Sequence, residues 1–237
     1  MLAAACLLAY ALSPGTIGLG GVTLKKLSLP IAADTTASET EGAAADTIAA
    51  LDEAPQRILF VGDSMLEGLS RRFGDYAAAN GHKLDVVLWY SSTTERWATS
   101  DTLTYFLRRY DPTFVVVCLG SNELFVRDLP DRDRHIATLL QRIGSLPYVW
   151  ISPPNWKEDT GINDLILRHV GERRYFDSRH LTLQRGRDRA HPTFAAAAQW
   201  MDSVATWMAG NTTAHPIRME RPDTTAKPNS LTLLSPE

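Results

Sequence analysis

The sequence is poor in cysteine and has no excess of charge of either sign. Only Cys6 and Cys118 occur in 237 residues, and they lie in separate apolar stretches, so a disulfide framework is not expected. The formal net charge of −3 provides no basic surface for nucleic acid. No His-Glu-x-x-His motif or cysteine cluster is present, and we predict neither a metal nor another cofactor. The 44% of hydrophobic residues suffices for the core of one domain with extra segments at its ends.

Long hydrophobic runs are also missing. Residues 1–12 are apolar, but a membrane span needs roughly 20 such residues, and no basic residue precedes them. We interpret residues 1–30 as an atypical signal or anchor segment, which predicts an envelope location, periplasmic or attached to the membrane through the N-terminus. Residues 31–54 are rich in Ala, Thr and acidic side chains, and residues 211–237 in Pro, Thr and Asn without a sustained period. We therefore predict a flexible linker and a disordered C-terminal tail.

Between these two segments, residues 55–210 alternate between short apolar runs and amphipathic runs. The apolar runs predict strands over residues 57–62, 84–90, 113–120, 148–152 and 174–177. The amphipathic runs predict helices after residue 64 and over residues 102–110, 133–144, 162–172 and 192–210. Strands that are apolar throughout are typical of a parallel sheet covered on both faces. The fold class is therefore α/β, a three-layer α/β/α domain with about five parallel strands.

Two of the predicted strands end in small polar loops. Gly62-Asp63-Ser64 follows the first strand, and Gly120-Ser121-Asn122-Glu123 follows the third. Because ligands bind at the carboxyl ends of parallel strands, we expect both loops beside one site. Ser64 is either the N-cap of the following helix or a nucleophile.

A nucleophilic serine needs a histidine base and a carboxylate that orients the histidine. Two Asp-x-x-His pairs are available, Asp177 with His180 and Asp188 with His191. The second pair lies in a loop just before the last predicted helix, and this loop can fold back over the strand ends. The position favours Asp188 and His191 modestly and leaves the first pair open.

Three motifs together resemble the GDSL or SGNH hydrolase superfamily. They are Gly62-Asp63-Ser64-Met65, Gly120-Ser121-Asn122-Glu123 and Asp188-Arg189-Ala190-His191-Pro192. Their order and their places at strand and helix ends match the family across the whole predicted core. The resemblance implies a flavodoxin-like sheet and a reaction without a cofactor.

The resemblance also implies a role for each matching residue. Ser64 matches the nucleophile, His191 the general base and Asp188 the carboxylate that orients it, which leaves His180 a structural role. The N–H of Ser64 and the side-chain amide of Asn122 match oxyanion donors.

One position departs from the family pattern. Where the family usually has a glycine that donates a further oxyanion N–H, this chain has Ser91-Ser92, and we favour Ser91. A serine N–H can also donate if the backbone adopts the angles that the glycine would have. We interpret four further residues as candidates for substrate binding: Ser92, Glu123, Trp97 and Trp156. For either tryptophan, packing beneath a loop is an equal alternative.

The resemblance implies a serine esterase that hydrolyses an O-acetyl or short acyl ester on a glycan or lipid through an acyl-enzyme. Two alternatives stay open: an O-acetyltransferase acting on envelope polysaccharide or peptidoglycan, and a non-catalytic envelope binding module on the same fold. The loop without glycine favours the binding module.

Overall fold

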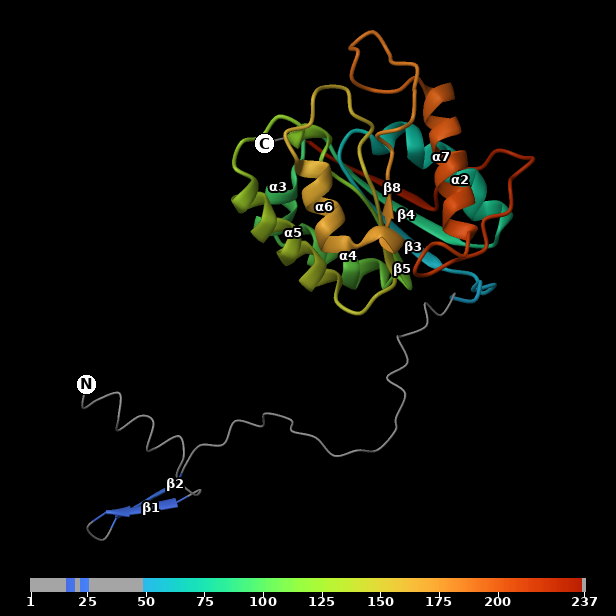
Figure 1. Ribbon diagram of the computed structural model, residues 1–237. Coiled ribbons are helices and arrows are strands. Elements are labelled where there is room, and N and C mark those ends of the chain that lie inside the picture. Colours follow the sequence, from blue (N-terminus) through green and yellow to red (C-terminus); the bar gives the residue numbers. More distant parts are fainter. Residues whose placement is uncertain (1–15, 20–21, 26–48, 236–237) are drawn as a thin grey trace. The chain divides into compact units, whose positions relative to one another are not determined.

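The computed structural model of the protein describes residues 16–19, 22–25 and 49–235, and the chain divides into two units at residue 46 (Figure 1). In the first unit, β1 (Thr16–Leu19) pairs antiparallel with β2 (Val22–Lys25). The rest of the predicted signal or anchor segment, and residues 31–48 of the predicted linker, lie outside the described residues. None of the described helices has the length and apolarity of a membrane span.

The second unit is an α/β domain on a six-stranded sheet in which all neighbouring strands are parallel. In spatial order the strands are β7 (Tyr175–Phe176), β6 (Tyr148–Ile151), β5 (Phe114–Cys118), β3 (Arg57–Gly62), β4 (Lys83–Trp89) and β8 (Ser230–Leu234). Without β8, this order is the flavodoxin-like one, which changes direction between β3 and β5. The fold class is therefore as predicted, with one strand more than expected.

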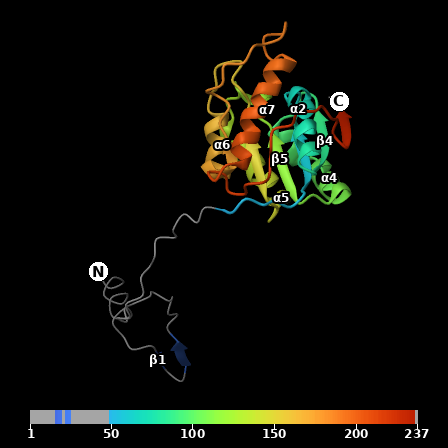
Figure 2. The ribbon, with the colours of Figure 1, turned by 90° about the vertical axis from the view of Figure 1, so that its right-hand side faces the viewer.

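Helices cover both faces of the sheet (Figures 1 and 2). One face carries α2 (Leu66–Ala79) and α7 (Phe194–Ala209). The other face carries α3 (Thr94–Thr99), α4 (Thr102–Tyr110), α5 (Leu129–Ile143) and α6 (Ile162–Val170). Two short 3₁₀ turns follow strand β5 and helix α6, at Ser121–Glu123 and Glu172–Arg174.

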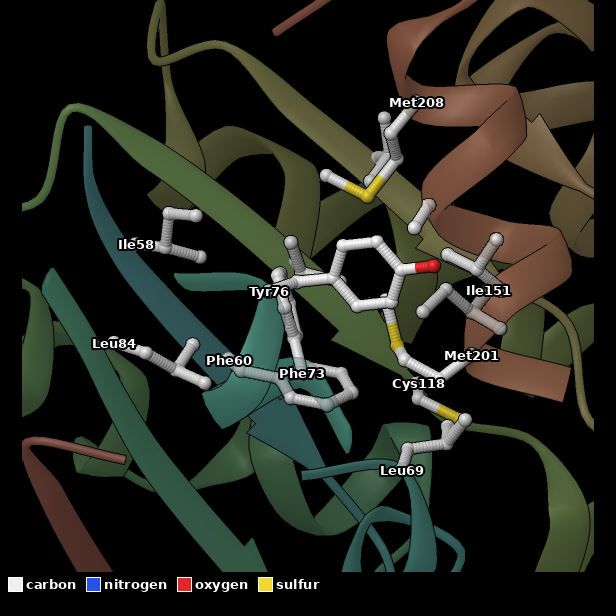
Figure 3. Close-up of a cluster of buried hydrophobic side chains, with 14 of the residues drawn as sticks. Ile58, Phe60, Leu69, Phe73, Tyr76, Leu84, Cys118, Ile151, Met201 and Met208 are labelled. Atoms are coloured by element: carbon white, nitrogen blue, oxygen red, sulfur yellow. The ribbon is translucent and has the colours of Figure 1, made fainter. Parts of the chain in front are cut away.

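The core consists of two layers because successive strand residues point to opposite faces. In β3, Ile58 and Phe60 face α2 and α7, while Leu59 and Val61 face the other helices. Figure 3 shows the first layer, where the Phe60 ring meets Phe73 of α2 edge to face, with ring centroids 5.3 Å apart. Parallel strands buried on both sides account for the continuous apolar runs in the sequence.

The prediction of a disordered C-terminal tail is wrong for residues 211–235. Residues 230–234 form β8, which lies beside β4 at the edge of the sheet (Figure 2). The segment is fastened by side chains far away in sequence: the buried Asn80 binds both backbone groups of Glu220, at 2.8 and 2.9 Å. In the predicted linker, the backbone N–H of Asp52 donates to the carbonyl oxygen of Pro216, while the side chain of Asn80 supplies the bonds to Glu220. Such long-range side-chain to backbone bonds leave no periodic pattern in the sequence.

Candidate active site

Ser64 lies in the turn that connects β3 to α2, at the carboxyl end of the sheet. The turn is tight, since a Cβ atom on Gly62 would lie 2.1 Å from the carbonyl oxygen of Cys118, and only glycine fits there. Helix α2 begins with Met65 as its N-cap and has no side-chain cap, so the hydroxyl of Ser64 does not cap the helix. That hydroxyl instead points to His191, which lies in the loop before α7.

The structure brings together the three residues of the expected triad. The Ser64 Oγ atom lies 2.7 Å from Nε2 of His191, and the other ring nitrogen, Nδ1, lies 2.7 Å from Oδ2 of Asp188. With the proton on Nδ1, the ring donates to the carboxylate and accepts from the serine hydroxyl. This is the arrangement in which a histidine can remove a serine proton.

Asp188 is fixed by local hydrogen bonds. Its Oδ1 accepts from the backbone N–H groups of Ala190 and His191, both at 3.0 Å. The hydrogen bond from the His191 ring, together with these two backbone bonds, lowers the pKa of Asp188 to about 2. The carboxylate is therefore ionised at neutral pH and can stabilise an imidazolium beside it.

The alternative pair is not assembled. Asp177 binds the guanidinium of Arg179, with Oδ2 to Nη2 at 2.7 Å, and this contact lowers the pKa of Asp177 against the effect of its partial burial. His180 is exposed and lies near the ring of Phe176, with centroids 6.4 Å apart. Of the two Asp-x-x-His pairs, only Asp188 with His191 reaches Ser64.

Asn122 is joined to the loop after β4. Its Nδ2 donates to the carbonyl oxygen of Ser92 at 2.9 Å, and an amide group has a second hydrogen to offer. Among the described residues, neither the N–H of Ser64 nor that of Ser91 donates a hydrogen bond, whereas the Ser92 N–H donates to Trp89. Of Ser91 and Ser92, Ser91 is thus the residue whose backbone N–H has no hydrogen-bond partner among the described residues.

Ser91 adopts the backbone conformation expected of a glycine. Its φ is +57°, in the left-handed region that costs a serine roughly 1–2 kcal/mol. A glycine would adopt this conformation without strain, so the strain at Ser91 lies beside the candidate site.

Three of the four residues expected to bind substrate are fully buried, and that expectation is wrong for them. Ser92 accepts a hydrogen bond from the Trp97 indole at 2.9 Å. Glu123 accepts from the backbone and hydroxyl of Thr94, both at 2.8 Å. These buried side chains form hydrogen bonds within and between the loops and do not face a ligand.

Glu123 also forms a buried ion pair on this side of the sheet. Its Oε1 lies 2.8 Å from Nε of Arg132, although that N–H does not point at the oxygen in hydrogen-bond geometry. Burial raises the pKa of Glu123 and outweighs the opposing bonds from Thr94.

Trp156, the fourth candidate, is half-buried and keeps part of its ring accessible. Its indole donates to the carbonyl oxygen of Ser121 at 2.9 Å, and its ring meets that of the exposed Phe125 edge to face. It can line a site beside Asn122, so it stays a candidate.

Two positioning residues were not identified from the sequence. Asp63 is fully buried and accepts from the Met65 N–H at 3.0 Å and the Ser121 hydroxyl at 2.6 Å, which ties the Ser64 turn to the Asn122 loop. Burial raises its pKa to about 6. Arg185 donates to the carbonyl oxygens of Ala190 and of residues 154 and 155, which anchors the His191 loop.

A small cavity opens beside the reactive atoms. It has a volume of about 90 Å³ and is lined by Ser64, Met65, Glu67, Gly68, His191, Pro192, Phe194 and Ala197. We call it the Ser64 cavity.

One group of side chains elsewhere has the composition of a metal site. Ligand atoms of Glu95, Asp131 and His135 lie within 4.8 Å of one another. The guanidinium of Arg132 already pairs with both carboxylates, at 2.9 and 3.3 Å. Arg134 pairs with Asp131 as well. Because cationic side chains already pair with both carboxylates, we assign no metal to this group.

No protein-family model matches the chain, and no curated protein matches its sequence. The functional conclusion therefore depends on the geometry of the site and on the three motifs.

Proposed function

We propose that the protein is a serine ester hydrolase of the SGNH type. The observation that carries the proposal is the continuous hydrogen-bonded relay from Asp188 through His191 to Ser64, with both contacts at 2.7 Å. It is supported by the position of Ser64 between the ends of β3 and β5, where the strand order changes direction and ligands of such sheets bind.

In the proposed reaction, the Ser64 oxygen attacks the carbonyl carbon of the ester, and Nε2 of His191 takes the hydroxyl proton. Asp188 keeps the ring in the required tautomer and stabilises the imidazolium. The N–H groups of Ser64 and Ser91 and the second amide hydrogen of Asn122 are the candidate donors to the oxyanion.

The tetrahedral intermediate collapses when the imidazolium gives its proton to the leaving alcohol, and the acyl group stays on Ser64. Water then attacks this acyl-enzyme, with His191 again as base, and the acid is released. The full cycle breaks one ester bond, consumes one water molecule and regenerates the serine. No cofactor takes part in these steps.

Hydrolysis of p-nitrophenyl acetate by the full chain tests the proposal. We expect Ser64-dependent release of p-nitrophenol, with kcat reduced at least about 10³-fold in Ser64→Ala and in His191→Ala. His180→Ala is the matched control and should retain the wild-type rate. A wild-type protein that is folded and inactive on this ester, or equal losses in the two histidine variants, would contradict the proposal.

A further inference from the structure

A groove of about 810 Å³ opens next to the Ser64 cavity. Glu67, Gly68 and Phe194 line both hollows, so the groove adjoins the cavity. It follows α2 from Glu67 to Asp75, a length of roughly 12 Å at 1.5 Å per residue. Residues 225–228 of the C-terminal segment line it as well.

The walls of the groove are mainly apolar. Leu88 and Tyr90 contribute from β4 and the residue after it, Ala198 from α7, and Leu231 and Leu233 from β8. The described residues expose six large hydrophobic side chains, and three of them line this groove. These three are Phe194, Leu231 and Leu233, each 52–55% exposed. Such a concentration of exposed apolar side chains is typical of a binding surface.

Most of the polar side chains in the groove are already engaged by the protein. Glu67 accepts a hydrogen bond from the Tyr90 hydroxyl, and Arg72 pairs with Asp75 at 3.1 Å and with Asp202 at 2.7 Å. Asp75 also accepts from the backbone N–H of residue 226.

At the junction with the Ser64 cavity, the Arg71 guanidinium stacks 3.9 Å over the Phe194 ring. A sugar needs free donors and acceptors, whereas an alkyl chain needs only apolar contact. The groove offers mainly apolar contact.

We propose that the groove holds the alkyl chain of an acyl ester whose carbonyl group lies at Ser64, so that the preferred substrates are medium-chain acyl esters. The inference rests on the proposed function and names its substrate class. It also gives a role to β8 and to residues 225–228, which add to the flavodoxin-like core the outer wall that lines an acyl chain.

The first test compares p-nitrophenyl octanoate with p-nitrophenyl acetate. We expect kcat/KM of the full chain to be at least tenfold higher for octanoate than for acetate. Burial of about two methylene groups in the groove is enough for a tenfold preference. Ala198→Phe, which fills the groove, should reduce the octanoate to acetate ratio about tenfold. Gln199→Phe adds the same ring at the next, exposed position of α7, outside the groove, and should keep the wild-type ratio. A wild-type ratio near one, or an equal change in both variants, overturns the inference.

The second test does not require turnover. Sodium decanoate is titrated into Ser64→Ala, and binding is followed by calorimetry. We expect binding that weakens at least tenfold when Ala198→Phe is added and is unchanged when Gln199→Phe is added. Decanoate binding that depends on the groove, without hydrolysis of either ester, would support the acyl-chain groove and contradict the proposed esterase activity. Serine-dependent hydrolysis of the acetate ester without decanoate binding would support the esterase activity and overturn the acyl-chain groove.

A second copy of the chain is the competing occupant of the same apolar surface. The mass of the wild type in solution is compared with that of the double variant Leu231→Thr, Leu233→Thr. We expect the same mass for both proteins and a reduced octanoate to acetate ratio for the variant. A wild-type dimer that this variant dissociates would make the groove an interface and overturn the inference.

Discussion

The two halves of the candidate site are held in opposite ways. In the reactive half, the side chains of His191 and Asp188 are 42% and 53% exposed and lie in a loop. In the other half, which we call the oxyanion half after its proposed donors, the residues beneath the Ser91 and Asn122 loops are fully buried, with Glu123 and Trp97 both at 0%. The first half depends on a few local hydrogen bonds and the second on a buried network that spans several elements.

This difference indicates which changes affect chemistry and which affect folding. Exposed polar side chains contribute little to the free energy of unfolding, because water replaces their contacts when they are removed. A buried charge that loses its partner retains a desolvation penalty. Substitutions in the reactive half should therefore affect kcat much more than stability, and those beneath the oxyanion half should affect stability first.

The largest effect is expected for Asp188→Asn, which breaks the reactive half alone. The amide favours the wrong histidine tautomer, so we expect kcat for p-nitrophenyl acetate to fall by about 10³–10⁴-fold. The melting temperature should fall only slightly, because the lost contacts are exposed to solvent. Asp177→Asn, in the other Asp-x-x-His pair, is the control and should leave kcat unchanged. Equal losses in both variants would mean that Asp188 has no specific role.

The pH dependence gives a second measure of Asp188. Its pKa is lowered from 3.8 to about 2, so its stabilising contacts are fully present above pH 3.8 and are lost as the pH falls through about 2. In acid titrations of the folded protein, followed by NMR of the carboxyl group, Asp188 should bind its proton near pH 2. A midpoint close to 3.8 would contradict the hydrogen bonds described here.

Asn122→Ala removes the proposed oxyanion donor and a hydrogen bond that joins two loops. We expect kcat to fall by about 10²–10³-fold with little change in KM, because the donor acts mainly in the transition state. Steady-state kinetics with p-nitrophenyl acetate measure both constants. A rise in KM with kcat intact would assign Asn122 to ground-state binding.

Glu123→Gln tests the buried half. The charge of Glu123 compensates Arg132, so we expect the free energy of unfolding, measured by urea denaturation, to fall by about 1.5–3 kcal/mol. Glu95 also pairs with Arg132 but is half-exposed. Glu95→Gln should therefore change the free energy of unfolding by less than about 1 kcal/mol. If the two variants are equally stable, burial does not determine how much these two carboxylates contribute to stability.

The smallest effect is expected at Ser91, where the strain of the left-handed backbone is relieved by glycine. Ser91→Gly should stabilise the fold by about 0.5–1 kcal/mol, since part of the gain is offset by the freedom of glycine in the unfolded chain. Ser91→Ala keeps the N–H group and should hold kcat within about twofold of wild type. A large loss in Ser91→Ala would assign the role to the hydroxyl instead of the backbone.

The sequence predicts most of the domain because its signals there are local. Apolar runs and helical periodicity place β3, α2 and the following elements, and the strand ends place Ser64 beside Asn122. The pair of Asp188 and His191 was chosen over Asp177 and His180 through the family resemblance, because its position before the last helix favours it only modestly. Within that helix, Phe194 is 52% exposed and lines the groove, which the helical periodicity does not predict.

What the sequence does not predict depends on contacts between distant residues. Strand β8 is missed because its partner is β4 and its anchors, such as Asn80, lie elsewhere in the chain. Glu123 and Trp97 were expected to face substrate because a residue in a loop at a strand end gives no sign of which way its side chain points. The partners that bury them come from neighbouring loops and helices.

Labelling with a fluorophosphonate probe tests the central claim most directly, because the probe reacts only with a serine whose proton can be removed. The account predicts that the folded wild-type protein is labelled at neutral pH, that peptide mass spectrometry finds the adduct on Ser64, and that His191→Ala is not labelled while His180→Ala is. A folded wild-type protein that stays unlabelled, or an adduct on another residue, would contradict it.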